Sequence, residues 1–168
     1  VYKELGDGDT EAGFLKLGTL PLDEVLPMAD HPVACIDCHD PETMSLRITR
    51  PAFMAGIAEE KLYSDGIEDY DVNRDATRNE MRSYVCAQCH VEYYFAGEDK
   101  VLRFPWKYGL DIDGIWQDYM DNGHVDWIHG ETDAAVLKAQ HPEFDVWSQG
   151  VHAANGVSCA DCHMPYQR

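Results

Sequence analysis

Hydrophobic residues along the chain fall into short groups, separated by polar stretches or by glycine and proline. Apolar runs such as residues 33–36 are much shorter than the ~18 residues of a membrane-spanning helix. Residues 1–34 are rich in Gly and Asp and contain three prolines, and residues 61–74 are polar. We therefore expect an irregular N-terminal stretch, a loop over residues 61–74 and no transmembrane segment.

Two helices are predicted in the first half of the chain. One begins at Pro51, because proline is favoured in the first helical turn and residues 52–60 are good helix formers. Asp75 is a candidate N-cap for the next helix, which passes through Met81 and Val85.

The second half contains further helix signals. Residues 101–106 are expected to be extended. Asp111 or Asp113 is a candidate N-cap for a helix that Asn122-Gly123 ends and that contains Ile115, Trp116 and Tyr119.

The region after residue 130 is predicted to hold two more helices. Thr132 can cap a short helix that continues to Ala139. His141-Pro142 breaks it and starts another, which runs to Gly156 with Phe144, Trp147 and Val151 on one face. The fold class is therefore mainly α. No low-complexity linker divides residues 1–168, so we expect a single domain.

The net charge of the chain argues against two classes of binding partner. The 168 residues include 31 Asp and Glu against 13 Lys and Arg, which gives a net charge of −18. Such a charge argues against nucleic acids and anionic membrane surfaces, whose phosphates would repel it. Residues 1–20 lack the basic and apolar regions of a secretory signal peptide.

All six cysteines lie in three copies of the pattern C-x-x-C-H. This pattern is the attachment signature of c-type haem. Its two thiols, one helical turn apart, add across the porphyrin vinyl groups, and the adjacent His ligates the iron. The sequence therefore predicts three covalently attached haems c, held by Cys35, Cys38 and His39, by Cys86, Cys89 and His90, and by Cys159, Cys162 and His163.

Other uses of these cysteines explain the pattern less well. A disulfide scaffold has no reason to place His after every second Cys, and a thioredoxin-like motif requires one C-x-x-C in a βαβ context. A zinc site of four thiolates pairs two C-x-x-C units and leaves the third unused.

Three haems would also shape the fold and the location of the protein. Because each porphyrin is a large apolar disc, we expect a multihaem cytochrome c with a haem-packed core and long irregular loops. Covalent haem is normally attached outside the cytoplasm, so we expect the protein to be periplasmic or exported.

Eight histidines are present, and the motifs use three of them. Distal ligands can come from the remaining five, although a surface or hydrogen-bonded role is as good an explanation for any one of them. These five are His31, His124, His129, His141 and His152.

Longer stretches around the motifs carry a family resemblance. They are CAQCHVEYYF (86–95), FPW (104–106), LKAQHPEF (137–144), WSQGVH (147–152) and GVSCADCHMP (156–165). Together they resemble the pentahaem cytochrome c nitrite reductase family, whose members form ammonia. The first motif, with the Arg50-Pro51 that follows, fits the segment expected upstream, so the resemblance extends over residues 31–166.

The resemblance implies a set of site residues. Tyr93 and His141 match the two residues that face the distal side of the family's catalytic haem. A structural calcium is implied at Glu92, the carbonyls of Tyr93 and Lys138, and the side chain of Gln140. Carboxylate and amide oxygens are suitable Ca²⁺ ligands. Without the resemblance, His141 is simply a polar residue before a helix-starting proline, and Tyr93 is better explained by core packing.

The resemblance also indicates which part of the enzyme is present. The three motifs correspond to haems two, three and four, and His152 resembles the distal ligand of the fifth haem. The upstream motif of the catalytic haem, its neighbouring Arg and the fifth motif are missing from these 168 residues. We therefore expect the central segment of a longer enzyme.

The implied activity is the six-electron reduction of nitrite to ammonium. The resemblance implies nitrite as substrate, a quinol-linked cytochrome as electron donor and a homodimer. Two alternatives stay open at this point: a related octahaem enzyme that reduces nitrite or oxidises hydroxylamine, and a stand-alone trihaem electron carrier. Local distal ligands among His31, His124 and His129 would favour the carrier.

Overall fold

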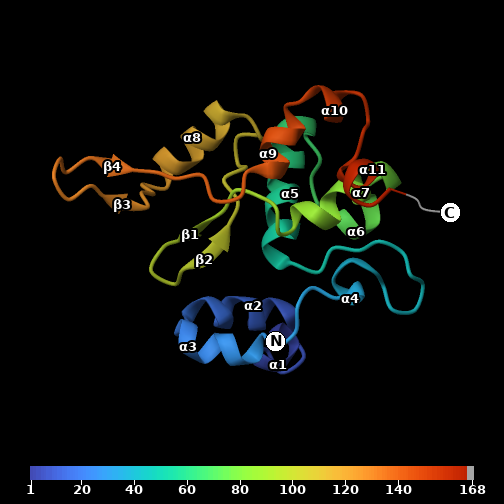
Figure 1. Ribbon diagram of the computed structural model, residues 1–168. Helices are drawn as coiled ribbons and strands as arrows, with labels where there is room; N and C mark the ends of the chain where they lie inside the picture. Colours follow the sequence, from blue (N-terminus) through green and yellow to red (C-terminus); the bar gives the residue numbers. More distant parts are fainter. Residues whose placement is uncertain (166–168) are drawn as a thin grey trace.

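The computed structural model describes residues 1–165, and in this range the chain is mainly α, as the sequence predicts (Figure 1). Four short strands form two hairpins beside the helices. None of the helices in the described residues is long and apolar enough to cross a membrane. The helices are α1 Tyr2–Leu5, α2 Thr10–Thr19, α3 Leu22–Val25, the 3-10 helix η1 Leu26–Met28, α4 Cys35–Cys38, α5 Pro51–Asp65, α6 Val72–Asp75, α7 Arg78–Ala87, α8 Ile112–Asp121, α9 Glu143–Ser148, α10 Val151–Ala154 and α11 Cys159–His163.

Most of residues 2–28 are helical, so the expectation of irregular structure over residues 1–34 is wrong there and is confirmed only for residues 29–34. Asp9 caps α2 by accepting hydrogen bonds from two backbone N–H groups of its first turn, at 2.9 and 3.1 Å. Gly13 lies so close to α1 that an added Cβ would stand 1.8 Å from the Tyr2 carbonyl oxygen. Asp9 therefore caps the start of α2, and Gly13 allows α1 and α2 to pack closely.

Helix α5 forms the centre of the fold. It begins at Pro51, as predicted, and continues to Asp65, where Gly66 ends it with a φ of 68°. Residues 61–65 are therefore helical rather than part of a loop, and α6 interrupts the same polar stretch at residues 72–75. The αL conformation at Gly66 is one that glycine adopts without steric cost.

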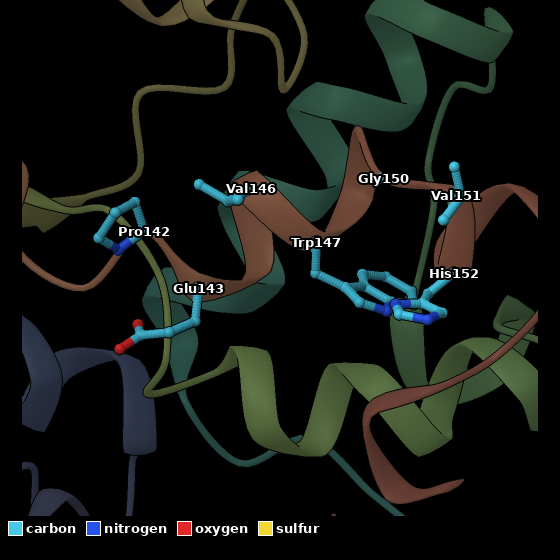
Figure 2. A pocket seen from close by; sticks show the side chains of 7 residues that line it. All are labelled: Pro142, Glu143, Val146, Trp147, Gly150, Val151 and His152. Carbon is cyan, nitrogen blue, oxygen red and sulfur yellow. The ribbon is translucent and has the colours of Figure 1, made fainter. Parts of the chain in front are cut away.

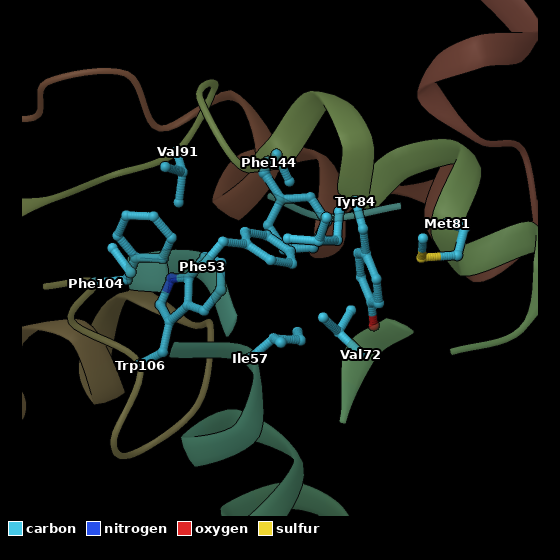
Figure 3. Packing of buried hydrophobic residues seen from close by; sticks show 12 residues of the cluster. Phe53, Ile57, Val72, Met81, Tyr84, Val91, Phe104, Trp106 and Phe144 are labelled. Carbon is cyan, nitrogen blue, oxygen red and sulfur yellow. The ribbon is translucent and has the colours of Figure 1, made fainter. Parts of the chain in front are cut away.

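A cluster of aromatic side chains packs around Phe53 of α5 (Figure 3). The Phe53 ring is fully buried, and four ring centroids lie 5.4–6.3 Å from its own, mostly edge to face; they belong to Tyr84, Phe104, Trp106 and Phe144. Such a cluster holds together segments that are distant in sequence. The protein part thus contributes an apolar core of its own.

Helix α7 begins at a different cap from the predicted one. Thr77 is its N-cap, and Thr77 and Glu80 form a reciprocal capping box with distances of 3.2 Å and 2.8 Å. Asp75 instead lies in α6 and pairs with Arg74. Met81 is buried in the core, in line with its predicted place on the helix.

Helix α8 follows the prediction closely. Asp111 caps it through a 2.8 Å bond from the Gly114 N–H, and the helix ends at Asn122-Gly123, with a Gly123 φ of 59°. Ile115 and Tyr119 are buried on its inner face, whereas Trp116 is exposed.

The expected helix from Thr132 to Ala139 is replaced by a hairpin. Strands β3 (Trp127–Ile128) and β4 (Ala135–Val136) are antiparallel, with Trp127 opposite Val136. The Thr132 hydroxyl lies 3.1 Å from His129 Nδ1 across the turn, and Asp133 has a φ of 53°. Thr132 therefore helps to close a turn instead of capping a helix.

The other hairpin and the last helices agree with the sequence in part. Strand β2 (Val101–Arg103) is the predicted extended segment and pairs with β1 (Tyr94–Ala96). The predicted helix from Pro142 to Gly156 is divided into α9 and α10 at Gly150, so Val151 does not share the buried face of Phe144.

Candidate functional site

Each C-x-x-C-H motif forms a helical turn. The first is α4, the second begins in the last turn of α7 and continues into the turn after it, and the third is α11. In the first two motifs the His N–H donates to the carbonyl of the first Cys, from His39 to Cys35 at 2.8 Å and from His90 to Cys86 at 2.9 Å. This places the two thiols of a motif one turn apart, which suits addition to two vinyl groups. None of the six cysteines, all of which lie in the described residues, forms a disulfide, and Cys35, Cys89 and Cys162 are exposed.

The second and third motifs lie beside each other (Figure 1). A cavity of about 330 Å³ lies between them, and Cys86, His90, Cys159, Cys162 and His163 line it together with Phe144, Trp147 and Val157. Burial raises the pKa of the Cys86 thiol, and the nearby Cys159 thiol adds to the rise. Thiols and imidazoles around an apolar space are a donor set that fits haem c.

His152 lies at the boundary of two spaces. It lines the cavity between the motifs, and it also lines an open, mainly apolar hollow of about 680 Å³ on the outer side of α9 and α10 (Figure 2). Pro142, Val146, Trp147 and Val151 also line that hollow, and the Trp147 side chain lies beside His152 (Figure 2). The role of His152 toward a further haem stays a prediction.

The segments expected to bind calcium come together at Glu92. This side chain is buried, with 4% of its surface exposed. One carboxylate oxygen accepts from the Gln140 backbone N–H at 2.5 Å, and the other from the Tyr119 hydroxyl at 2.7 Å. Burial raises the pKa of Glu92, and the bonds from Tyr119 and Gln140 oppose the rise. The Glu92 side chain therefore connects its own segment to that of Gln140, which lies 48 residues further along the chain.

Other acidic side chains hold this region in place. Asp145 of α9 accepts from the Glu92 N–H at 2.9 Å and from the Trp106 indole N–H at 2.6 Å. Asp126 accepts from the Lys138 N–H at 2.7 Å. Across the described residues, no three side chains of His, Cys, Asp or Glu form a metal cluster. A calcium site of the implied kind would not form such a cluster, because its ligands are one carboxylate, one amide and two backbone carbonyls.

Sequence reasoning missed Tyr119, Asp126 and Asp145. Asp145 carried one usable signal, because it is a charged residue between the apolar Phe144 and Val146. Tyr119 and Asp126 gave none, since their partners lie 27 and 12 residues away along the chain.

The two expected catalytic residues directly follow the joined positions 92 and 140. Tyr93 is half-buried, packs against the core and meets Phe95 edge to face at 6.0 Å. The His141 side chain is 59% exposed, with Nδ1 3.7 Å from a Glu143 carboxylate oxygen. His141 is thus open to a ligand, and Tyr93 is held by packing.

The remaining histidines have other surroundings. His124 packs on Tyr94 and Tyr119, with ring centroids at 4.8 and 5.2 Å. His129 lies in the β3–β4 turn, and the His31 side chain is 87% exposed. Packing and turn contacts therefore account for His124 and His129 without a haem.

Known proteins resemble the chain over most of its length. Residues 11–168 match the family model of cytochrome c552. A cytochrome c-552 from Porphyromonas gingivalis is 49% identical over 136 residues, which cover 81% of this chain and 26% of that protein. The cytochrome c nitrite reductase subunit NrfA of Nitratidesulfovibrio vulgaris is 39% identical over 180 residues, covering 99% of this chain and 32% of that protein.

A solved structure agrees with these relatives. The catalytic subunit NrfA of Desulfovibrio desulfuricans cytochrome c nitrite reductase, described with two calcium sites, superposes with a TM-score of 0.66 and 38% identity. The match covers 81% of this chain and 29% of that one, so the chain spans about a quarter to a third of these relatives. The resemblance seen in the motifs is confirmed, and with it the attachment of haem c: the chain belongs to the cytochrome c552 family, which includes the cytochrome c nitrite reductases NrfA.

Proposed function

We propose that this chain is the central block of an ammonia-forming nitrite reductase and carries three of its haems. The observation that carries the proposal is the buried Glu92, which joins the segment of Tyr93 to that of His141. A substrate pocket shared by Tyr93 and His141 requires these two segments to be held together, and Glu92 does so. The relatives that are nitrite reductases support the same function.

The cysteines and histidines of the three motifs would hold the haems. When bound, haem c supplies an iron that accepts and passes on single electrons. The chain's own part is to attach each haem, to ligate it through His39, His90 and His163, and to fix its position. The second and third motifs lie side by side and line one cavity, which supports two haems attached next to each other.

His141 would supply protons to the substrate pocket. Nitrite reduction consumes protons as well as electrons, and an imidazole is a suitable donor near neutral pH. The neighbouring Glu143 carboxylate lies 3.7 Å from His141 Nδ1. Tyr93 would offer its hydroxyl as a hydrogen-bond donor to the anion.

Calcium would fix these two residues relative to each other. Glu92 and Gln140 would bind it through their side chains, and Tyr93 and Lys138 through their carbonyls. Oxygen donors of this kind suit Ca²⁺, and the NrfA neighbour is described with calcium sites. We further propose a periplasmic or exported homodimer that takes electrons from a quinol-linked cytochrome, with His152 as the distal ligand of a haem attached elsewhere.

Nitrite turnover in the full-length protein tests the proposal. His141→Asn is expected to reduce turnover by about 10²-fold or more, the size of effect of a proton-transferring side chain, while haem content stays unchanged. His129→Asn is the matched control, because His129 lies in a hairpin turn. Normal turnover in His141→Asn would contradict the assignment. An intact mass showing eight haems would favour the octahaem enzyme, and one showing three would favour the electron carrier.

A further inference from the structure

The residue before the second cysteine of each motif bonds outside its own turn. It is Asp37 in the first motif, Gln88 in the second and Asp161 in the third. Haem attachment requires only the two cysteines and the histidine of a C-x-x-C-H motif. The contacts of this variable position therefore need an explanation of their own.

Asp161 makes two kinds of contact with its two oxygens. One oxygen accepts from the backbone N–H and the hydroxyl of Ser158, at 2.7 and 2.8 Å, and so caps α11. The other accepts from the Arg82 guanidinium at 2.6 Å, and Arg82 lies on α7. The third attachment turn is thus closed and tied to the helix that leads into the second. A further bond supports the tie, because the Cys159 N–H donates to the buried Ser83 hydroxyl at 3.2 Å.

Asp37 repeats the arrangement in the first motif. One oxygen accepts from the Ala34 N–H at 2.8 Å and caps α4. The other accepts from the Arg50 guanidinium at 2.9 Å, at the start of α5. In two motifs more than 100 residues apart, one carboxylate oxygen of the aspartate thus caps the attachment turn and the other binds an arginine.

Gln88 connects the second motif to the first. Its side-chain NH₂ donates to the Asp37 carbonyl at 3.1 Å, and its side-chain oxygen accepts from the Thr49 N–H at 3.1 Å. Gln88 is buried, so these bonds are shielded from water. All three attachment turns are consequently held in one frame that runs through α7.

We propose that Asp37, Gln88 and Asp161, with Arg50 and Arg82, are positioning residues that set the orientation of the three haems relative to one another. The inference rests on haem attachment at the three motifs and is independent of nitrite as substrate. A carboxylate that caps a turn and also binds a fixed guanidinium leaves the turn little freedom to rotate.

The Arg82–Asp161 pair allows a test in the full-length, haem-loaded protein. The variants are Arg82→Gln, Asp161→Asn and the double variant, which removes one positive and one negative charge and so leaves the local net charge unchanged. Arg74→Gln is the matched control, because Arg74 makes an equally short 2.6 Å pair with Asp75 within α6. Intact mass counts the haems, electron paramagnetic resonance reports the haem environment, and hydrogen exchange follows the backbone of residues 157–163.

The expected result is a change confined to the third motif. In the double variant we expect an unchanged haem count, a shifted resonance signal for one haem and about two- to fivefold faster exchange in residues 157–163, as loss of a half-exposed ion pair would produce. Arg74→Gln should leave all three measurements unchanged. The corresponding Arg50→Gln, Asp37→Asn double variant should affect the first haem alone.

Three outcomes would overturn the proposal. The first is a double variant identical to the parent protein, even if the single variants shift, since that pattern reflects charge alone. The second is an equal change in Arg74→Gln. The third is loss of all three haems, which would show a general folding role. Loss of the third haem alone would count with this outcome, because it would show a role in haem attachment rather than in haem orientation. Nitrite turnover does not enter these readouts, so a wrong substrate assignment would leave them interpretable.

Discussion

Replacing Glu92 by Gln isolates the charge of the buried carboxylate, because the two side chains have nearly the same shape. Glu92 accepts from the Gln140 N–H at 2.5 Å and from the Tyr119 hydroxyl at 2.7 Å. In Glu92→Gln the amide oxygen can still accept from Gln140, while the amide NH₂ donates to the Tyr119 oxygen, which can also act as an acceptor. Both partners therefore remain bonded.

The size of the effect follows from these two bonds. A hydrogen bond to a charged group contributes about 1.5–3 kcal/mol and a neutral one about 0.5–1.5 kcal/mol. Burial opposes this loss, because it raises the pKa of Glu92 and so disfavours the charged form. We expect Glu92→Gln to lower the free energy of unfolding by only about 1 kcal/mol. Glu92→Ala leaves two donors without an acceptor and should cost about 2–6 kcal/mol, at 1–3 kcal/mol for each.

Three measurements on the full-length protein separate folding from function. Denaturant unfolding followed by far-ultraviolet circular dichroism gives stability, elemental analysis gives bound calcium, and nitrite consumption gives turnover. With calcium removed from both proteins by a chelator, Glu92→Gln should stay nearly as stable as the parent protein. With calcium present, it should lose bound calcium and turnover. Retained calcium in Glu92→Gln would refute the ligand role of Glu92. Equal instability of the Gln and Ala variants would refute the hydrogen-bond argument.

Two further predictions concern local structure. Gly13→Ala should open the α1–α2 contact, because the new Cβ would lie 1.8 Å from the Tyr2 carbonyl oxygen; hydrogen exchange of residues 1–20 should then rise, whereas Gly130→Ala, with open space around it, should behave like the parent protein. Burial acts to raise the pKa of Glu80, but bonds from Thr77 and the Lys61 ammonium outweigh it and lower that pKa. The ionised Glu80 carboxylate therefore stabilises the folded protein above its unfolded pKa of about 4.3, and this stabilisation is lost as the pH falls through the folded pKa. Glu80→Gln should make the free energy of unfolding depend less on pH in this acid range. An unchanged pH dependence would contradict the prediction.

Local signals explain which parts of the fold could be predicted. Pro51 and Asp111 mark the starts of α5 and α8 through backbone chemistry that needs no tertiary partner. Gly13 misled the prediction, since its effect depends on the packing of α1 against α2. Thr132 misled it too, because one residue type can cap a helix or close a turn.

In the candidate site, too, the residues that the sequence predicted belong to local motifs, and the residues that it missed act through tertiary contacts. All the haem-attaching residues of a C-x-x-C-H motif lie within five consecutive positions, so the sequence alone predicts which residues attach haem. Tyr119 and Asp145 act on Glu92 across 27 and 53 residues, and no periodicity encodes such contacts. The resemblance indicated Tyr93 and His141, and their catalytic roles stay predictions.

The β3–β4 hairpin projects away from the helices that carry the motifs (Figure 1). Its register is fixed by its own backbone pairs, and Gly130 at its tip has open space around it. Loop tips of this kind accept inserted sequence readily. A fluorescent or affinity tag placed after Gly130 should therefore leave the attachment turns where they are, which gives a handle for purifying or imaging the loaded protein without altering either end of the chain.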